Sequence, residues 1–402
     1  MMGIVALDLT ALRAQFPSLD TGLAFFDGPA GTQTPTVVAD AIAATITGPL
    51  SNRGTFGESD RNAENAVQGF RAAYADLLNL PAEGIVHGRS ATQLTYDFSR
   101  ALAKTWREGD EIIVSRLDHD ANVRPWLQVA ETVGVTVRWI EIDPDTTELD
   151  LDSYELALSS RTRLVAVTAA SNVLGTIPPL HRIADRAHEV GALVYVDGVH
   201  YASHHLVDVP ALGADLFVCS PYKFHGPHCG VLGAAPELLE SLSPDKLAPS
   251  PDHVPERFEL GTLPYEILAG ATATVDFLAT MDPGPAGARR ERLSHSLAAV
   301  HEHETSLRAR LHDGLQRLDD ITVHSKAPDR TATVLMSLAG RDARDAQSHL
   351  AARKVVTAAG SFYAYEPFHA LKLEDPALRV GLAAYNTAGE VDRLLEGLDD
   401  FL

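Results

Sequence analysis

The sequence predicts an α/β protein with a mostly parallel sheet flanked by helices and a smaller α+β domain at the C-terminus. Runs of β-forming residues alternate with amphipathic helical stretches before residue 282, and such alternation is typical of parallel sheets. The chain of 402 residues is longer than one hydrophobic core usually accommodates. The segment 282–287, with the sequence DPGPAG, indicates a linker.

These features predict three parts of the chain. Residues 1–24 form an N-terminal segment that packs with the small domain, residues 25–282 form the large domain, and residues 290–402 form the small C-terminal domain. We expect this division because the clearest break in periodicity is the linker between the last two parts.

The predicted elements of the large domain follow from local hydrophobic spacing. The apolar residues of 63–78, for example, recur at the three- and four-residue intervals of a helix. Helices are predicted at 9–16, 37–46, 63–78, 94–106, 125–133, 180–190 and 267–281. Strands are predicted at 85–86, 111–115, 135–142, 163–169, 193–196 and 216–219, with a hairpin-like piece at 230–234.

The small domain is predicted to mix short strands with helices. A long amphipathic helix at 292–318 begins it, a strand at 333–337 follows, and helices are expected at 346–352 and 391–398.

Composition excludes several classes of function. The net charge of −21 argues against a nucleic-acid partner, because phosphate binding requires a basic surface. The two cysteines, Cys219 and Cys229, exclude a disulfide framework and fit a reducing cytoplasm. No signal-peptide pattern begins the chain, and no apolar run approaches the roughly 20 residues of a membrane span. We therefore expect a cytoplasmic protein without a membrane partner.

An acid and a lysine follow two neighbouring strands. Asp197 ends the β-forming run 193–196, and Lys223 follows the run 216–219 after a short loop. Ligands of open α/β sheets bind at the carboxyl edge, where both side chains would lie. Pyridoxal 5'-phosphate requires a lysine for its Schiff base and an acid that keeps its ring nitrogen protonated. The pair therefore indicates this cofactor.

Two further strand ends carry candidate cofactor contacts. Ser90, Ala91 and Thr92 lie at a strand-to-helix turn, where free backbone N–H groups form a natural phosphate site. Simple N-capping of the helix by Ser90 or Thr92 is the alternative. His119 follows the strand 111–115 and could stack on a flat ring, although a histidine that only begins a helix is the simpler interpretation.

Other polar residues complete the candidate site. Asn172 could reach a ring substituent, and His200 and Ser220 would lie beside the cofactor. Arg379 is a candidate clamp for a substrate carboxylate, because its planar fork suits bidentate recognition. Further candidates for substrate contacts are Arg53, which could equally lie in a solvated loop, and Tyr363, which could equally pack in a core.

Three histidines, His200, His204 and His205, lie close together in the sequence. They could suggest a metal site, but no matching carboxylate or cysteine spacing supports one. We expect no metal.

The sequence resembles the class V aminotransferase family, in its cysteine desulfurase-like branch, from about residue 25 to residue 398. The segments that carry the resemblance are 117–122 (LDHDAN), 170–176 (ASNVLGT), 196–200 (VDGVH), 219–223 (CSPYK), 258–262 (FELGT) and 379–387 (RVGLAAYNT). The resemblance implies a pyridoxal-phosphate enzyme of fold type I that is a homodimer with active sites at the subunit interface.

The resemblance also implies roles for individual residues. Lys223 would form the Schiff base, Asp197 would pair with the pyridine nitrogen, and His119 would stack on the ring. Phosphate contacts would come from the residues Ala91, Thr92, Ser220, Tyr222 and, from the neighbouring subunit, Thr262. Asn172 and Arg379 would hold the substrate carboxylate.

The chain departs from the desulfurase pattern at three places. His200 stands where desulfurases usually have glutamine, and Tyr222 stands where they usually have histidine. The loop 357–363 (TAAGSFY) occupies the place of the loop that carries the catalytic cysteine, and it contains no cysteine. Without a mobile thiolate, the usual transfer of sulfur to the enzyme lacks its nucleophile.

The sequence leaves four functions to weigh. A lyase that eliminates the β-substituent of a cysteine-like amino acid comes first, because it keeps the carbanion chemistry and omits the persulfide. An aminotransferase or epimerase comes second, and a desulfurase that uses an external thiol comes third. A non-catalytic cofactor-binding scaffold is the fourth, and the joint presence of Lys223, Asp197, His119 and Arg379 argues against it.

Overall fold

The computed structural model describes residues 7–402 except 283, 285, 374 and 375. Two of these residues, Pro283 and Pro285, belong to the linker predicted at 282–287, so that part of the prediction lies outside the described residues. No helix in the described part of the chain is long and apolar enough to cross a membrane.

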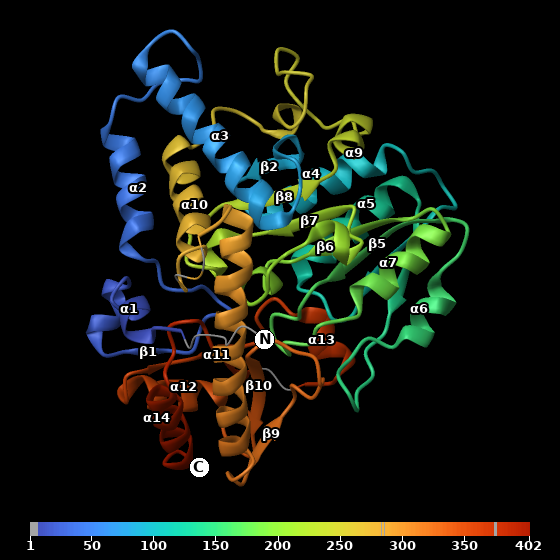
Figure 1. Ribbon diagram of the computed structural model, residues 1–402. Helices are drawn as coiled ribbons and strands as arrows, with labels where there is room; N and C mark the ends of the chain where they lie inside the picture. The colour runs from blue at the N-terminus through green and yellow to red at the C-terminus, as the bar shows by residue number, and fades with distance from the viewer. Residues whose placement is uncertain (1–6, 283, 285, 374–375) are drawn as a thin grey trace.

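A seven-stranded sheet forms the larger part of the molecule (Figure 1). Its order is β2 (Ile85–Gly88), β8 (Gly230–Ala234), β7 (Leu216–Cys219), β6 (Leu193–Asp197), β5 (Thr162–Thr168), β3 (Glu111–Ser115) and β4 (Thr136–Ile140). The last five of these run parallel, whereas β8 is antiparallel to both of its neighbours. The mostly parallel sheet expected from the sequence is therefore present.

Apart from the edge strand β4, the strands are buried on both faces, which explains their nearly continuous apolar sequences. In β6, Val194 and Val196 enter one hydrophobic cluster, while Tyr195 between them enters another on the opposite face. The same alternation occurs in β7, where Phe217 faces the first cluster and Val218 the second.

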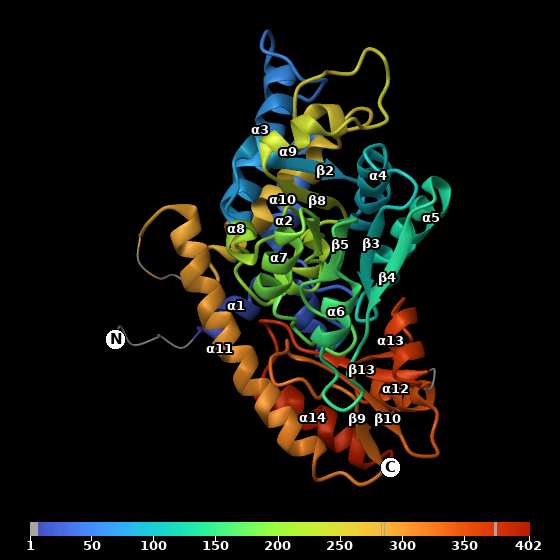
Figure 2. The same cartoon turned by 90° about the vertical axis from the view of Figure 1, so that its right-hand side faces the viewer.

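Helices cover both faces of this sheet (Figure 2). One face packs against α4 (Ala91–Ala103) and α5 (Arg124–Val133). The other packs against α3 (Glu58–Leu78), α7 (Leu180–Glu189) and α10 (Tyr265–Leu278). Shorter or peripheral helices are α2 (Thr36–Thr47), α6 (Leu151–Ala157), α8 (Val209–Leu212) and α9 (Pro236–Ser241).

A second, antiparallel sheet has its own hydrophobic core. Its order is β12 (Ala358–Gly360), β13 (Ala377–Gly381), β10 (Thr333–Leu338) and β9 (Ile321–Val323). Side chains of α12 (Ala343–Ala352), α14 (Ala388–Asp399) and the C-terminal half of α11 (Arg289–Leu315) fill this core. In Figure 1, α11 extends alongside both sheets.

The N-terminal part of the described chain contacts the elements around the small sheet. The strand β1 (Ala24–Phe25) pairs in parallel with β11 (Val355–Val356). Arg13, at the end of α1 (Leu9–Arg13), forms an ion pair of 3.0 Å with Glu390 of α14.

Two differences from the predicted elements have clear causes. The helix predicted to begin at residue 94 begins at Ala91, because Ser90 caps it and accepts a hydrogen bond from the Gln93 N–H at 3.1 Å. The helix α6 was not predicted, although Asp150 caps it in the same way through the N–H groups of Asp152 and Ser153.

Candidate active site

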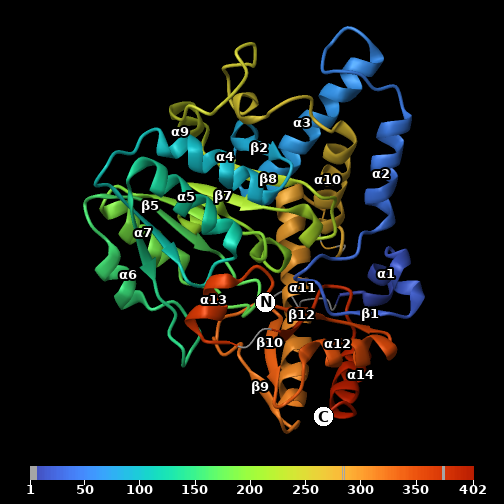
Figure 3. The same ribbon diagram turned by 180° about the vertical axis from the view of Figure 1, so that it is seen from behind.

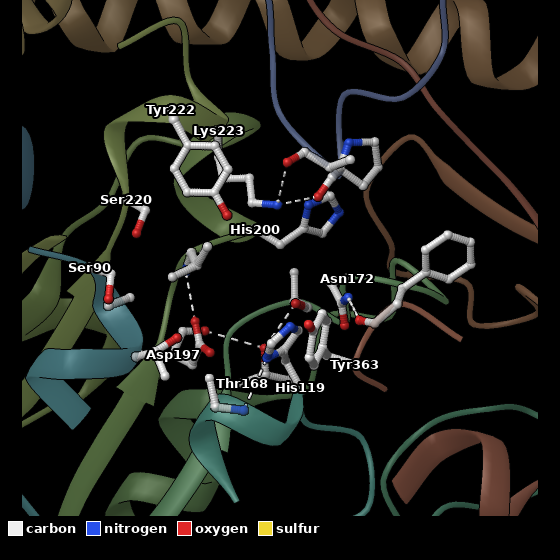
Figure 4. Close-up of a pocket in the computed structure, with 18 of the residues that line it drawn as sticks. Ser90, His119, Thr168, Asn172, Asp197, His200, Ser220, Tyr222, Lys223 and Tyr363 are labelled. Atoms are coloured by element: carbon white, nitrogen blue, oxygen red, sulfur yellow. Dashed lines mark hydrogen bonds between the residues drawn. The ribbon is translucent and has the colours of Figure 1, made fainter. Parts of the chain in front are cut away.

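A cavity of about 380 Å³ lies where the carboxyl ends of the parallel strands face the small sheet (Figure 4). Most of the site residues predicted from the sequence line it, and they come from segments far apart in the chain. They are Ser90, Ala91, Thr92, His119, Asn172, Asp197, His200, Ser220, Tyr222, Lys223, Tyr363 and Arg379.

Lys223 projects its amine into this cavity from the turn that follows β7. The amine donates hydrogen bonds to the carbonyl oxygens of Pro29 and Ala30, the latter at 3.1 Å. Burial and, to a smaller extent, the nearby Arg379 charge lower the pKa of Lys223 to about 7, and Asp197 opposes the change. A large share of this amine is therefore neutral, and able to accept a proton, near pH 7.

Asp197 ends β6 and presents a buried carboxylate to the cavity. Its Oδ1 accepts a hydrogen bond from the Val199 N–H at 2.9 Å. Burial raises the pKa of Asp197 to about 6, and this hydrogen bond and the charge of Lys223 limit the rise. The following Gly198 allows the backbone to pack closely against Phe217, because a Cβ atom would lie 1.8 Å from the Phe217 ring.

The N-terminus of α4 forms another wall. Its first N–H groups, from Ala91 and Thr92, have no partner within the helix and are available to an anion. Gly230 of β8 permits this close packing, since a Cβ there would lie 2.4 Å from the Ser90 carbonyl carbon. Ser90 therefore caps the helix, and the first N–H groups remain free within it, as a phosphate site would require.

His119 lies on the wall next to Asp197. Its Nδ1 accepts a hydrogen bond from the Ala121 N–H at 3.0 Å. Burial and, to a smaller extent, the charge of Lys223 lower the pKa of His119 to about 4, so the ring is neutral near pH 7. The neighbouring Asp118 holds this turn by accepting hydrogen bonds from Ser115 and from Asn122, the latter at 2.7 Å.

His200 links the large-domain cavity to the small sheet. Its Nε2 lies 3.0 Å from the hydroxyls of both Thr331 and Thr333. Its Nδ1 is buried and has no hydrogen-bond partner among the described residues. Burial holds the pKa of His200 well below its usual value, so the ring is neutral and can donate through only one nitrogen.

The histidine cluster does not form a metal site in the described part of the chain. His204 Nδ1 lies 2.7 Å from an oxygen of Glu304, and the His205 ring contacts the His301 ring. No three histidine, cysteine, aspartate or glutamate side chains among the described residues are placed to hold a metal ion.

Arg379 of β13 reaches the cavity from the small sheet and is 3% exposed. Its Nη1 donates to the Asn172 carbonyl oxygen at 2.9 Å, while its Nε has no partner among the described residues. Burial lowers the pKa of Arg379 to about 9, and Asp27 opposes the change. The guanidinium therefore remains charged near pH 7 and keeps hydrogen-bonding capacity for an anion.

The cysteine-free loop 357–363 closes one side of the cavity. The Asn172 amide donates to the Phe362 carbonyl oxygen at 3.0 Å, and the Asp120 N–H donates to the Tyr363 carbonyl oxygen at 2.8 Å. The Phe362 ring centre lies 3.9 Å from the guanidinium carbon of Arg379. Backbone hydrogen bonds thus place two aromatic side chains beside the substrate clamp predicted from the sequence.

Both cysteines lie away from this loop. Cys219 and Cys229 are buried in a hydrophobic cluster under the large sheet and do not line the cavity. Burial raises the pKa of both thiols, to about 12 for Cys229. Neither side chain is a thiolate near pH 7 in this position.

Two predicted site residues do not line the cavity in this chain. The Arg53 guanidinium is bound by Glu64 at 2.8 and 3.0 Å and by Glu256 at 3.2 Å. These carboxylates neutralise the charge of the Arg53 guanidinium outside the cavity. Thr262 is exposed and borders a separate cavity beside the start of α4.

Eight residues that line the cavity were not among those predicted, and Thr168, Thr95 and Phe362 are three of them. Thr168 ends β5, and its hydroxyl donates to the Ala170 carbonyl at 2.8 Å. Thr95 lies one turn into α4, and Phe362 lies in the small-domain loop. Thr168 could have been found, because it is the last polar residue of a strand whose neighbour ends on Asp197.

Comparisons with known proteins agree with this geometry. A lysine amine and a buried carboxylate in one cavity at the carboxyl edge of a parallel sheet are typical of the fold type I pyridoxal-phosphate enzymes. Residues 24–394 match the aminotransferase class-V family, so the chain belongs to that family and is a pyridoxal-phosphate-dependent enzyme.

Individual relatives cover nearly the whole chain. An aminotransferase-like protein, FGM3, of Gibberella zeae is 32% identical over 99% of this chain and 99% of its own. A probable cysteine desulfurase of Xylella fastidiosa is 30% identical over 97% of this chain and 95% of its own. The crystal structure of the cysteine desulfurase CsdA from Escherichia coli is 27% identical, with a TM-score of 0.87 and 98% of each chain covered.

Proposed function

We propose that this enzyme cleaves the C–S bond of a cysteine-like amino acid by β-elimination, with pyridoxal 5'-phosphate bound in the cavity between the two sheets. The observation that carries the proposal is the combination of an intact lysine–aspartate–arginine set with a cavity wall that lacks a thiol. The carbanion chemistry of the family requires the lysine–aspartate–arginine set. Transfer of sulfur to the enzyme requires a thiol, which this cavity wall lacks.

The residues of the cavity fit this cofactor. Besides the lysine amine and the buried carboxylate, the cavity offers the free N–H groups of a helix N-terminus for a phosphate. Two buried polar atoms, His200 Nδ1 and Asn172 Oδ1, lack partners among the described residues. Buried polar groups are normally satisfied, so such atoms are the expected sign of a polar ligand.

Each group of cavity residues would contact a different part of the cofactor. Lys223 would hold it covalently and Asp197 would pair with its ring nitrogen. The neutral ring of His119 would lie against its face, and His200 would donate to its phenolic oxygen. The phosphate would be held by Ser90, Ala91, Thr92, Ser220 and Tyr222. When bound, the cofactor stabilises negative charge at the substrate α-carbon.

The substrate is held and deprotonated by the chain itself. Arg379 binds the substrate carboxylate, and Asn172 supports it from the opposite strand end. The Lys223 amine, when it is not bonded to the cofactor, would take the α-proton of the substrate. A lysine whose pKa is lowered to about 7 is well suited to this task, because a base is most effective when its pKa is near the working pH.

The two cysteines provide a direct check of the thiol-free reaction. Replacing both Cys219 and Cys229 by alanine should leave turnover of a cysteine-derived substrate unchanged, because neither side chain reaches the cavity. Each truncation is expected to cost on the order of 1 kcal/mol of stability, so activity is compared at a temperature well below unfolding. Loss of turnover in a folded, cofactor-loaded double variant would point to a persulfide carrier instead.

The lowered pKa of Lys223 predicts how cofactor incorporation depends on pH. Only the neutral amine attacks an aldehyde, so the rate at which apoprotein takes up pyridoxal 5'-phosphate should rise with pH and level off just above 7. An ordinary lysine would give a rate that keeps rising towards its usual pKa of 10.5. Stopped-flow absorbance across this pH range distinguishes the two, and a midpoint near 10 would contradict the assignment.

We further propose that the enzyme is a cytoplasmic homodimer whose subunits complete each other's sites. Thr262, which lies outside this chain's own cavity, would then contact the phosphate of the neighbouring subunit. The exposed position of Thr262 beside the start of α4 supports this assignment.

A further inference from the structure

A second cavity, of about 900 Å³, adjoins the cofactor cavity and shares two of its wall residues, Phe362 and Tyr363. We call it the outer cavity. Its other walls come from the start of α5 and from α13 (Tyr365–Ala370) with the residues that follow it. Figure 3 shows α13 between the small sheet and the strand ends of the large sheet.

Aromatic side chains dominate the outer cavity. Tyr363 is 79% exposed and Tyr365 is 60% exposed, which is unusual for large rings outside a binding surface. The rings of Tyr365 and His369, one helical turn apart on α13, are nearly parallel, at 3° and 6.1 Å between centres. Together these residues present flat faces to the cavity.

Two of the three Asp, Arg and Lys side chains that line the outer cavity are paired with each other, and the third is Lys372. Asp120 and Arg124 form an ion pair of 2.8 Å, and Arg124 also lies 3.6 Å from Glu366. The guanidinium of Arg124 lies over the Tyr365 ring, 5.7 Å from its centre. The part of the wall around Tyr365 therefore offers a flat, uncharged group an aromatic face beside charges that are already paired.

The boundary between the two cavities is a fixed piece of backbone. Phe362 and Tyr363 both have left-handed backbone angles, with φ of 57° and 54°, which bulky residues rarely adopt. The hydrogen bonds from Asn172 and Asp120 to their carbonyl oxygens hold this conformation. The Tyr363 ring lies 5.6 Å from that of His119, so one side chain borders both the cofactor cavity and the outer cavity.

We propose that the outer cavity receives the sulfur substituent of the substrate, and that the substrates are cysteine S-conjugates with an aromatic group. This inference rests on the proposed β-elimination. The inner cavity, at about 380 Å³, is near the lower end of the roughly 300–1,000 Å³ typical of ligand sites, and it must also hold the cofactor. A long sulfur substituent must therefore extend out of the inner cavity. The larger, aromatic-lined outer cavity beside Tyr363 is the space that adjoins it.

The reaction on such a substrate is balanced without an oxidant or reductant. Lys223 removes the α-proton, the Cβ–S bond breaks, and the sulfur leaves with a proton as the aromatic thiol. Water then releases the remaining three carbons as pyruvate and the amine as ammonium. One S-conjugate and one water thus give one thiol, one pyruvate and one ammonium ion.

The test compares S-benzyl-L-cysteine with S-methyl-L-cysteine as substrates of the cofactor-loaded enzyme. We expect Tyr365→Ala to lower kcat/KM for the benzyl conjugate about tenfold, the usual value of one lost aromatic contact, and to leave the methyl conjugate unaffected. Leu156→Ala, which removes an apolar side chain that is 88% exposed on α6, is the matched control and should change neither. Equal effects of Tyr365→Ala on both substrates would overturn the inference.

Binding of inert analogues separates this inference from the proposed reaction. Calorimetry should show that 2-amino-5-phenylpentanoate, the carbon analogue of the benzyl conjugate, binds more tightly than norvaline, and that Tyr365→Ala removes the difference. If this preference holds while no thiol is released from any conjugate, the proposed elimination fails and the aromatic specificity stands. If thiol is released but norvaline binds as tightly, the outer cavity does not receive the substituent.

Discussion

Replacing Lys223 by alanine is expected to reduce turnover by about a thousandfold or more, because the site loses its general base, typically worth about 10²–10⁴-fold, and its covalent hold on the cofactor. The visible absorbance of the lysine-bound cofactor should disappear. The burial of this amine lowers its pKa to about 7, so that it can act as a base near neutral pH.

A surface lysine provides the control for this variant. Lys104 is bonded to Asp245 on the protein surface, and Lys104→Ala should leave both the absorbance and the turnover unchanged. A visible band that persists in Lys223→Ala would show that another lysine binds the cofactor. In that case the assignment of the whole cavity would be wrong.

Replacing Arg379 by glutamine is expected to raise KM for every α-amino-acid substrate about 10- to 100-fold, with a smaller change in kcat. A hydrogen bond to a charged group contributes about 1.5–3 kcal/mol, and loss of binding that is equal in the ground state and the transition state appears in KM. Steady-state kinetics on one conjugate at saturating cofactor measures the two constants separately.

The choice of glutamine and the absorbance of the cofactor together show whether the change is specific to substrate binding. Glutamine retains a donor for the Asn172 carbonyl, so the wall of the cavity is disturbed less than by alanine. The absorbance of the bound cofactor should be unchanged, because the clamp contacts substrate rather than cofactor. An unaltered KM with a normal spectrum would contradict the role of Arg379 as the carboxylate clamp.

The large sheet was largely predictable because its strands, apart from the edge strand β4, are buried on both faces. Runs such as 112–114 and 193–196 are short and rich in β-forming residues, so their length and composition identify them without tertiary information. Helix starts were less predictable. The beginning of α4 depends on a cap at Ser90, and apolar spacing alone placed it three residues late.

The candidate site was predictable where a side chain follows a strand end. Asp197, Lys223 and His119 were found in this way, and the structure places all three in one cavity. The contributions of the small domain were harder to find. The place of Phe362 over Arg379 depends on a left-handed backbone fixed by Asn172 and by a contact with Asp120, which no local pattern encodes.

The outer cavity is a further feature that local sequence patterns could not predict. The aromatic residues between 362 and 369 are equally compatible with core packing when only the sequence is considered. In the structure Phe368 is buried, whereas Tyr363 and Tyr365 are exposed next to the cofactor cavity. The difference arises from the position of α13 against the large domain, where Glu366 is bonded to Arg116.

The most direct test of the central claim is identification of the three-carbon product. Wild-type enzyme loaded with pyridoxal 5'-phosphate would be incubated with S-benzyl-L-cysteine labelled with ¹³C in its three cysteine carbons, and the products analysed by mass spectrometry. Elimination without a resident thiol predicts labelled pyruvate, ammonium and free benzyl thiol in equal amounts. Labelled alanine would instead show transfer of sulfur to an acceptor, and labelled amino acid of unchanged mass but inverted chirality would show epimerisation; either result would contradict the proposed reaction.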